Sequence, residues 1–501
     1  MNTLRLKNYR CFEDTGIINL KPLTLLVGAN SSGKSSFLKF FPLLKQSIGI
    51  KKNGVFLWYS DDVDFKDFKN TVKNGEGSII INMELFLADQ IDVNESTIIA
   101  EYFKTKGIEY EGTNVSIELT ISEIDKNTDY LEHLIISYYN QQIDISFSKE
   151  GKVHVFVNGD EFKKDTISNI QLSGSILPRI IFSNNDVTYY LGSKEIRDMI
   201  IEYLDSCNAA KDFPINELFF RSFYFLSKDS FIECMGAVFK GKNNSSLNLD
   251  IEKLNNLYLL YNLNNIIDLA NGYIHSIAMN MSYVKPLRVM PERYYRYQNY
   301  SVDEISSDGK NLAMFFANLK KDDLKKFQKW TFDNFGFMLE PHKLEGHVEI
   351  DIIEKDKTGR NMVDTGFGYN QLLPILAIIW NAINNKHRRF YYPYMNNAIK
   401  FIVIEQPELH LHPRILSMFA EMLGSVINNV KKNEDVRFII ETHSETIINK
   451  IGSLIHSSKL NEEKVNVVLF NAKEEGLQNY VEQASFDKKG YLNNWPIGFF
   501  L

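Results

Sequence analysis

The stretch Gly28-Ala29-Asn30-Ser31-Ser32-Gly33-Lys34-Ser35 matches the pattern G-x-x-x-x-G-K-[ST] at every fixed position. An apolar run at residues 23–27 lies directly before it and predicts a strand that is buried on both faces. Residues 36–48 show a helical pattern that Pro42 should kink or shorten. A strand, a glycine-rich turn and a helix in this order predict a loop that binds phosphate groups.

The residue types in this loop suit a nucleotide with a bound Mg²⁺. Glycines let the backbone turn tightly so that its amides point at phosphate oxygens, and the following helix directs its positive end at the same anion. Lys34 would reach the β- and γ-phosphates, and the Ser35 hydroxyl would complete the coordination shell of Mg²⁺. We expect the nucleotide to contact Gly28, Asn30, Ser31, Ser32, Gly33, Lys34, Ser35 and Ser36.

Three segments nearer the C-terminus carry further candidate residues. Residues 399–405 predict a buried strand that ends in Glu405, a carboxylate suited to Mg²⁺, although an ordinary charge at a strand end has the same pattern. Residues 438–445, Phe-Ile-Ile-Glu-Thr-His-Ser-Glu, place His443 just beyond a second buried strand, at the start of a helix. Residues 365–371 form a glycine-rich loop that opens a helix, which predicts a second anion site.

The 501 residues predict roughly two to four structural units at the usual domain size. Residues 78–182 have short alternating and β-branched runs, whereas residues 194–282 repeat apolar residues at helical spacing and predict several helices. The last third alternates between the two kinds of element, which predicts βαβ units and a parallel sheet. We expect strands at 347–354, 399–404, 436–441 and 464–470, and helices within 310–335, from about 370, at 413–430 and at 444–456.

The charge balance limits the class of protein. Lys and Arg total 56 against 63 Asp and Glu, so the net charge of −7 argues against a chain that binds nucleic acid with its whole surface. Three widely spaced cysteines exclude a disulfide framework and a zinc knuckle. The first residues lack the apolar stretch of a signal peptide, and no run approaches the length of a membrane span. We therefore expect a cytoplasmic protein.

Four segments together resemble the ABC-type ATPases of the SMC and OLD (overcoming lysogenization defect) branch. The likeness is strongest to stand-alone bacterial AAA proteins with an ABC-like head, many of which belong to anti-phage defence systems such as Septu, PARIS and the retron-associated ATPases. The segments are LRLKNYRCFEDTGIINLKPLTLLVGANSSGKSS (4–36), GFGYNQLLPIL (366–376), EQPELHLHP (405–413) and ETHSE (441–445). Weaker likeness extends to YVKPLRVMPERYY (283–295) and GYLNNWPIGFF (490–500).

The resemblance implies a role for each motif. Gly28–Ser35 is similar to the Walker A loop, Glu405 to the Walker B acid, and His443 to the switch histidine that contacts the γ-phosphate. Residues 408–412 lie where such heads have a loop that communicates between subunits. The signature loop, which covers the nucleotide of the other subunit, is matched by Gly366, Gly368, Asn370 and Gln371. The resemblance thus implies ATP and Mg²⁺ as cofactors and a head-to-head dimer, or a higher even oligomer, around ATP.

Two positions depart from the family pattern. Gln406 follows the Walker B acid, where ABC proteins commonly place the glutamate that polarises water, and an amide cannot accept a proton. Hydrolysis is therefore expected to be slow, or to depend on Glu408 or His443 as catalytic residues. Asn370 stands near the position at which many relatives have serine, which affects the expected contact with the γ-phosphate.

The motifs and the resemblance predict an α/β P-loop NTPase of the ABC-ATPase type. Its mixed sheet should carry an added antiparallel β subdomain and a mainly helical insertion. We expect residues 1–182 and 285–501 to form the two parts of one discontinuous ATPase head, and residues 183–284 to form the insertion.

Several other residues allow a structural as well as a functional interpretation. His410 and His412 are spaced as a pair of metal ligands, but without a cysteine or further histidine nearby a packing or dimer-contact role is favoured. Arg288 and Arg293 suit a salt bridge, which is favoured, or contact with nucleotide or DNA. Solvated or packing surfaces are favoured over nucleic-acid contacts for the basic runs at 320–326 and 386–389 and the tyrosine-rich residues 294–300.

The favoured functional hypothesis is an ATP-dependent sensor and scaffold that controls a separate effector, a nuclease or toxin, in anti-phage defence. It follows from the phosphate-binding loop, from Gln406, and from the lack of an acidic cluster suited to a two-metal nuclease after Glu445. The alternative is an autonomous DNA-binding ATPase of the SMC or repair kind, which the acidic composition and the missing coiled coil disfavour. Expected partners are a second copy of the chain and the effector, with nucleic acid possible and a membrane excluded.

Overall fold

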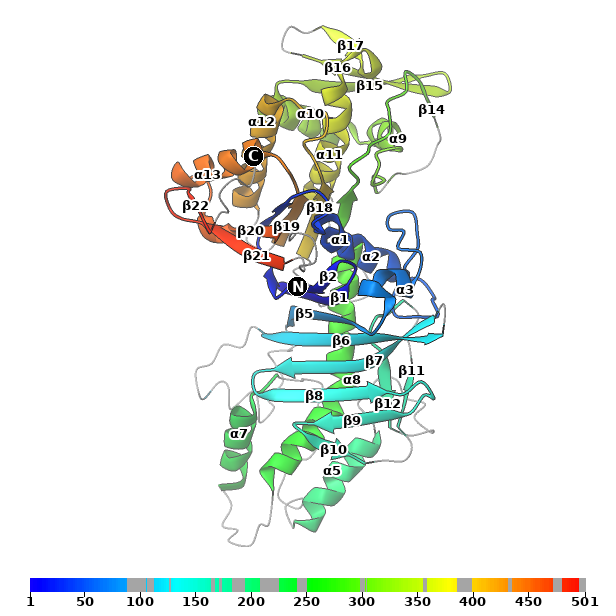
Figure 1. Cartoon of the computed structure of the whole chain (residues 1–501), viewed down its shortest axis with the longest axis vertical. Coiled ribbons are helices and arrows are strands. Elements are labelled where there is room, and N and C mark those ends of the chain that lie inside the picture. Colours follow the sequence, from blue (N-terminus) through cyan, green and yellow to red (C-terminus); the bar gives the residue numbers. More distant parts are fainter. Residues whose placement is uncertain are drawn as a thin grey trace. The chain divides into compact units, whose positions relative to one another are not determined.

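The structure is a computed structural model, drawn in Figure 1. It describes residues 1–87, 105, 112–125, 128–163, 167–170, 174–182, 194–207, 225–240, 250–297, 302, 304–354, 358–384, 399–430, 435–471 and 480–494. The chain forms two compact units, each assembled from separate segments of the sequence. The first unit comprises residues 1–9, 46–60 and 64–275, and the second comprises residues 10–45, 61–63 and 276–501.

An antiparallel sheet forms a large part of the first unit. Its strands are β1 (Thr3–Tyr9), β5 (Ile79–Leu87), β6 (Thr113–Asp125), β7 (Thr128–Tyr138), β8 (Gln141–Phe147), β9 (Val153–Val157) and β10 (Asp160–Phe162). They lie in the order β10-β9-β8-β7-β6-β5-β1. Alternating sequences bury one face of the sheet, as in β5, where Ile79, Ile81 and Met83 are fully buried. Asn158 and Gly159, with φ of 51° and 91°, form the two-residue turn between β9 and β10.

The helix α8 (Ile251–Met279) crosses the strands of this sheet, as Figure 1 shows. Its residues up to His275 belong to the first unit. Asn255 on α8 donates from Nδ2 to Oε1 of Gln141 at 3.0 Å, and Asn271 accepts from the amide of Leu177 at 3.0 Å. The prediction of several helices in 194–282 is confirmed. The other elements of this unit are α3 (Phe68–Thr71), α5 (Lys194–Ser206), α7 (Lys228–Lys240), the 3₁₀ turn Lys73–Gly75, and the strand pair β11 (Ser168–Ile170) and β12 (Arg179–Ile181).

A mixed sheet organises the second unit. Its strands are β4 (Leu23–Gly28), β13 (Ser282–Val284), β18 (Ile399–Glu405), β19 (Asp435–Glu441), β20 (Val465–Asn471), β21 (Tyr480–Phe486) and β22 (Leu492–Asn493). They lie in the order β13-β18-β19-β4-β20-β21-β22. The first five are parallel, and β21 and β22 continue the sheet in antiparallel pairings. Every residue of β4 and β18 is buried, which agrees with their continuous apolar sequences.

Helices cover this sheet, and a smaller sheet accompanies them. The chain breaks between α1 (Lys34–Leu38) and α2 (Phe40–Ser47), because Pro42 has no amide hydrogen to donate to the preceding turn. The expected helices of the last third are all present. They are α9 (Leu312–Asn318), α10 (Lys321–Phe335), α11 (Phe367–Asn384), α12 (Pro413–Asn429) and α13 (Glu445–His456). The smaller sheet contains β14 (Tyr295–Arg296), β15 (Met338–Leu344), β16 (His347–Ile353) and β17 (Gly359–Asn361), and short elements lie at β2 (Phe12–Asp14), β3 (Ile18–Asn19), Met362–Asp364 and Glu462–Lys464.

The predicted fold class is confirmed. The mixed sheet carries the glycine-rich loop. Along the chain, most strands of the antiparallel sheet follow this loop. Helices α5, α7 and α8 come next, before the C-terminal strands of the mixed sheet. The antiparallel sheet and the helices up to residue 275 fall in one compact unit, and the predicted domain limits at 182/183 and 284/285 stay a prediction. Within the described segments, none of the helices combines the length and the apolar character needed to cross a membrane.

Candidate nucleotide-binding site

The glycine-rich loop connects the C-terminal end of β4 to α1, as its sequence predicts. Gly28 lies so close to the neighbouring strand β20 that a Cβ would come within 2.2 Å of the carbonyl oxygen of Phe470. Gly33 has a φ of 105°, and a Cβ there would lie 2.5 Å from Sγ of Cys11. Both positions therefore require glycine for physical reasons. The loop residues Asn30 and Ser31 are exposed, Ser31 has a φ of 63°, and Ser36 is half-buried.

Lys34 is buried inside the loop. Its Nζ donates to the carbonyl oxygens of Gly28 at 3.0 Å and Ala29 at 2.6 Å. Burial lowers the pKa of Lys34, and the negative charges of Glu441 and Glu408 partly oppose this shift. The ammonium group thus has neutral hydrogen-bond acceptors in the loop, and a phosphate group would give it an anionic one.

Two buried carboxylates lie side by side at the ends of β18 and β19, where Glu405 and Glu441 are register partners. Ser35 donates from Oγ to Oε1 of Glu441 at 2.7 Å, and Tyr283 donates from its hydroxyl to Oε1 of Glu405 at 2.7 Å. Burial raises the pKa of both carboxyls, and for Glu441 the nearby Glu405 adds to the effect and the pKa reaches about 7. A divalent cation between the loop and these strand ends would relieve this repulsion.

Sequence reasoning missed Glu441 as a site residue. It ends a buried strand as Glu405 does, and that shared pattern was the available signal. The contact with Ser35 joins residues 406 positions apart, so it depends on the placement of β19 directly beside β4.

The segment after β18 lies against the start of α13. Glu408 accepts at Oε1 from the amide of His443 at 2.7 Å and at Oε2 from Oγ1 of Thr442 at 2.9 Å. Burial raises the pKa of Glu408 and lowers that of His443, for which Lys34 adds to the shift. Gln406 has a φ of 41° and donates its amide to the carbonyl oxygen of Glu441 at 2.9 Å. Glu408 therefore holds the backbone of the histidine segment in place, while the imidazole stays neutral.

The glycine-rich residues 365–371 open α11 as expected. A Cβ on Gly366 would meet no heavy atom within 4 Å, whereas Gly368 faces the side chain of Ile415 on α12. Asn370 and Gln371 are buried in the first turn of the helix. Gln371 accepts at Oε1 from Nη1 of Arg288 at 3.5 Å. Arg288 also donates from Nη2 to the carbonyl oxygens of Glu405 at 3.3 Å and Gln406 at 3.5 Å, and so joins this loop to the end of β18.

Several buried polar atoms in these motifs have no hydrogen-bond partner. They are Oγ of Ser32, Oε2 of Glu441, Nε2 of His443, Nε of Arg288 and Oδ1 of Asn370. Buried polar atoms in proteins are normally bonded, so this set marks places that a ligand would complete. Together with Lys34 and the Ser35 hydroxyl, they fit the phosphates and the Mg²⁺ of a nucleotide.

The structure decides between some of the structural and functional interpretations. Arg293 pairs with Asp364, at 2.9 Å from Nη1 to Oδ2, so the salt-bridge interpretation is confirmed for this residue. The salt-bridge interpretation is wrong for Arg288, which pairs with no carboxylate of the described residues. His412 accepts from the amide of Arg414 at 3.2 Å and caps α12. Among the described residues, no group of three or more His, Cys, Asp or Glu side chains is arranged to hold a metal ion.

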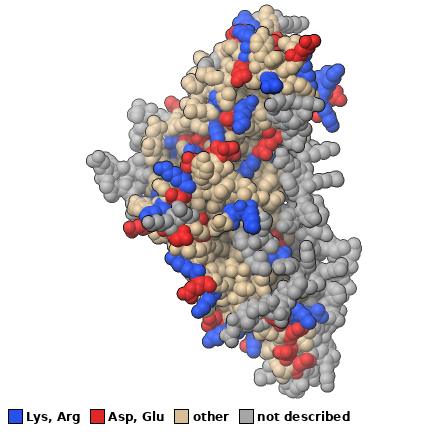
Figure 2. Space-filling model, turned by 90° about the vertical axis from the view of Figure 1, so that its right-hand side faces the viewer, with Lys and Arg blue, Asp and Glu red and all other residues tan. Residues whose placement is uncertain are grey.

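Surface charges of both signs occur near each other. In the basic run of α10, Lys326 pairs with Asp323 at 2.9 Å. Figure 2 shows Lys and Arg side chains interspersed with Asp and Glu side chains among the described residues of the face that it presents. The basic run 386–389 and residues 298–300 of the tyrosine-rich segment lie outside the described residues.

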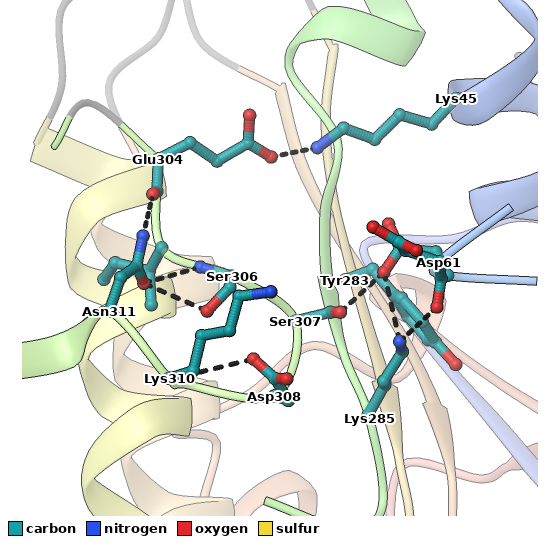
Figure 3. Close-up of a pocket in the computed structure, with 12 residues that line it drawn as sticks. Lys45, Asp61, Tyr283, Lys285, Glu304, Ser306, Ser307, Asp308, Lys310 and Asn311 are labelled. Atoms are coloured by element: carbon teal, nitrogen blue, oxygen red, sulfur yellow. Dashed lines mark hydrogen bonds and ion pairs between the residues drawn. The ribbon is translucent and has the colours of Figure 1, made fainter. Parts of the chain in front are cut away.

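A polar cavity of about 520 Å³ lies in the second unit, and Figure 3 shows its walls. Lys45 pairs there with Glu304, and Asp62 accepts from Oγ of Ser307 at 2.6 Å and lies 3.5 Å from Nζ of Lys285. None of the predicted site residues lines it, but its wall contains Tyr283, which bonds Glu405. The lining residues are Lys45, Asp61, Asp62, Tyr283, Lys285, Glu304, Ile305, Ser306, Ser307, Asp308, Lys310 and Asn311.

The sheet order and the loop at the end of β4 define a P-loop ATPase of the α/β class. The chain matches the AAA ATPase domain family over residues 1–448 and belongs to that family. It is therefore an ATPase of the AAA type.

Two further comparisons describe similar proteins. Endonuclease GajA of Bacillus cereus (strain HuB5-5) is 24% identical over 232 residues, which cover 42% of this chain and only 31% of GajA. A Pyrococcus furiosus Smc head domain bound to the C-terminal domain of ScpA matches with 11% identity and a TM-score of 0.33 over 97% of this chain and 96% of that chain. The SMC head domain of Thermotoga maritima matches with 10% identity and a TM-score of 0.33 over 96% and 97%. The fold class rests on the sheet order and the family.

Proposed function

We propose that the chain binds ATP with Mg²⁺ between the glycine-rich loop and the ends of β18 and β19. The hydrogen bond of 2.7 Å between Ser35 and Glu441 carries this proposal, because it joins the loop hydroxyl to a buried carboxylate that has a second, unpartnered oxygen. In the proposed site Lys34 binds the β- and γ-phosphates, and Ser35 and Glu405 hold the cation. Mg²⁺ would neutralise charge on the phosphates.

The arrangement of Gln406, Glu408 and His443 favours slow hydrolysis. The Gln406 amide can orient water but cannot accept its proton. Both oxygens of Glu408 accept hydrogen bonds from the Thr442–His443 segment, so this carboxylate acts as a positioning group. Burial lowers the pKa of His443, and its Nε2 has no partner among the described residues. This nitrogen is therefore the group best placed to accept a hydrogen bond, and then a proton, from the attacking water.

ATP is proposed to bring two copies of the chain together. The first turn of an α-helix leaves backbone amides without acceptors inside the helix, and open space surrounds Gly366 at the start of α11. A second copy could present its nucleotide there, so that each signature loop covers the ATP of the other copy. This arrangement would make dimerisation depend on nucleotide.

The dimer is proposed to act as a sensor and scaffold that controls a separate effector in anti-phage defence. The motifs shared with stand-alone AAA proteins of such systems support this role, as does the similarity to GajA, a protein named as an endonuclease. An ATPase that turns over slowly keeps one nucleotide state long enough to hold a partner. The effector would be a nuclease or toxin.

The alternative function is an autonomous DNA-binding ATPase. The similarity to an endonuclease favours contact with nucleic acid, whereas the intermixed charges in Figure 2 and the net charge of −7 oppose it. DNA-stimulated turnover that falls steeply with salt would support this alternative over the scaffold. Turnover that is constant across a DNA titration would exclude it.

The central experiment compares the wild type with Lys34→Ala in ATP binding and in mass. Calorimetry with ATP and Mg²⁺ should show binding that Lys34→Ala abolishes, and light scattering should show an ATP-dependent dimer only in the wild type. Lys326→Ala, at an exposed ion pair on α10, is the matched control and should behave as the wild type. If the wild type binds no ATP, or stays monomeric with it, the corresponding part of the proposal fails.

A second variant tests the dimer at the signature loop. Gly366→Asp places a negatively charged side chain in open space, so the fold should be retained while the ATP-dependent dimer is lost. Gly236→Asp, which also has open space around it on α7, should leave the dimer intact.

A further inference from the structure

Arg288 is a buried arginine that forms no ion pair with any described residue. Its exposed fraction is 6%, and each of its contacts is to a neutral group. Three other described arginines, by contrast, are held by aspartates: Arg179 by Asp268, Arg293 by Asp364 and Arg437 by Asp435. A buried charge costs free energy unless a counter-charge compensates it. The burial of Arg288 thus calls for an anion.

The hydrogen bonds that Arg288 makes are long, and its Nε makes none with the described residues, so the guanidinium can still bind an anion. Its hydrogen bonds to Gln371, Glu405 and Gln406 measure 3.3–3.5 Å, longer than the usual limit of about 3.2 Å. Glu408 is the carboxylate whose charge acts on it, but both Glu408 oxygens accept bonds from residues 442 and 443. Burial lowers the pKa of Arg288 to about 10, so the guanidinium remains charged at neutral pH.

The surroundings of Arg288 offer further donors to an anion. The first turn of α11, an 18-residue helix, lies against it through Gln371, and the helix start at Gly366 is open. Asn370 in the same turn is 5% exposed, and its Oδ1 has no partner. Because the two ends of an amide are assigned from their bonds, Asn370 can equally present its NH₂ group to an anion. The Arg288 guanidinium therefore contacts the first turn of α11 through Gln371, and the same turn carries the unpartnered amide of Asn370.

We propose that Arg288 and the first turn of α11 form a binding subsite for a phosphoryl group, with Arg288 as the anion-binding residue. The subsite rests on the proposed function, since its natural ligand is the terminal phosphate of ATP. Arg288 bonds the carbonyls of Glu405 and Gln406, so it lies beside the residues that end the Walker B strand. A planar guanidinium binds a phosphoryl group through two parallel bonds, and ADP lacks the group that would fill this subsite. Binding of the γ-phosphate to Arg288 would thus affect α11, because Arg288 bonds Gln371 in the first turn of that helix.

Calorimetry with ATP and with ADP, each with Mg²⁺, tests the subsite in Arg288→Gln. We expect Arg288→Gln to bind ATP about 10- to 100-fold more weakly and to bind ADP as the wild type does, since a charge-assisted bond to the γ-phosphate is lost. Arg293→Gln, in the same segment but exposed and paired with Asp364, should change neither affinity. Arg288→Lys should recover part of the ATP affinity, because it keeps the charge and loses the planar fork.

The same variants distinguish the possible sources of the phosphoryl group. Loss of ATP affinity in the dilute monomer assigns it to the nucleotide of the same chain, whereas a loss confined to concentrations at which dimers form assigns it to the second copy. A rise in melting temperature with inorganic phosphate alone, absent in Arg288→Gln, assigns it to free phosphate.

Two results would overturn the subsite. One is an ATP-to-ADP affinity ratio that Arg288→Gln leaves unchanged, with no phosphate effect on the wild type. The other is an equal loss of both affinities together with a lower melting temperature of the ligand-free variant, which indicates a purely structural arginine. If Arg288→Gln does not fold, Arg288→Lys provides the same comparison with a smaller expected loss. A wild type that binds no nucleotide contradicts the proposed function instead, and the phosphate measurement then decides the subsite.

Discussion

Asp129 in the first unit and Glu441 in the second are both buried carboxylates, and they differ in how their oxygens are satisfied. Their exposed fractions are 4% and 2%, and burial raises the pKa of each. Asp129 accepts at Oδ2 from the amide of Val55 at 2.8 Å and at Oδ1 from Nε1 of Trp58 at 2.9 Å. Among the residues that the structure describes, Glu441 accepts only from Ser35, and its Oε2 has no partner. Full satisfaction marks a structural carboxylate, and the free oxygen marks one that can bind a ligand.

The largest effect is expected from Asp129→Ala. The change leaves two buried donors, the Val55 amide and the Trp58 indole, without an acceptor, which should lower the free energy of unfolding by about 2–5 kcal/mol. Urea unfolding followed by tryptophan fluorescence measures it. Asp198→Ala, at an exposed position on α5, is the control and should change the free energy by less than about 0.5 kcal/mol. A similar small change in Asp129→Ala would remove the distinction between the two carboxylates.

Glu441→Gln should act in the opposite direction, with a size that depends on pH. The folded-state pKa of Glu441 is about 7, above the ordinary 4.5, so the folded chain takes up a proton between these values and the wild type gains stability as the pH falls from 7. At pH 8 its buried charge lowers stability, and the variant should be more stable by up to about 3 kcal/mol.

The difference between the two proteins should shrink as the pH falls from about 7 towards 4.5. Glu405 and Glu408 also have raised pKa values, but both proteins contain them, so comparing the two unfolding curves isolates Glu441. The negative charge of Glu441 beside Ser35 and Glu405 favours Mg²⁺ in the proposed site, so Mg²⁺ binding should weaken over the same range. A variant that is less stable than the wild type at pH 8 would make Glu441 a structural residue like Asp129.

The sequence predicts the parts of this comparison that depend on local pattern. Residues 23–27 and 399–405 are apolar runs, and both become fully buried strands of the parallel sheet. Gly28 and Gly33 are needed because of close neighbours, and the match to the loop pattern anticipates them without knowledge of those neighbours.

The remaining features depend on distant parts of the chain. Ser35 meets Glu441 only because β19 lies beside β4, and Tyr283 meets Glu405 across 122 positions because β13 pairs with β18. The role of Asp129 likewise depends on a loop 71 positions away. For Arg288 the sequence favoured a salt bridge, and only the structure shows that none of the described carboxylates pairs with it.

Gln406→Glu should convert an amide that orients water into a base. The new carboxylate would stand directly after Glu405 at the end of β18, and general-base catalysis should raise ATP turnover about 10- to 100-fold. Phosphate release at saturating ATP measures it, with Lys34→Ala combined with Gln406→Glu as the background that should show no turnover. An unchanged rate would mean that proton transfer does not limit turnover, and His443→Ala would then be expected to have little effect as well.

Tyr283→Phe should have the smallest effect on stability. It removes a hydrogen bond from Glu405, so that this carboxylate, like Glu441, has an oxygen without a partner. The hydroxyl of Tyr283 is the hydrogen-bond donor to Oε1 of Glu405, and its removal leaves that buried oxygen without its bond at 2.7 Å. The free energy of unfolding should fall by about 1–2 kcal/mol, because a buried acceptor loses its hydrogen bond. Tyr297→Phe, which loses a longer bond of 3.3 Å to neutral Asn318, should cost less. Equal losses in the two variants would show that groups other than this tyrosine stabilise Glu405. The contrast between fully bonded carboxylates and carboxylates with a free oxygen would then rest on Glu441 alone.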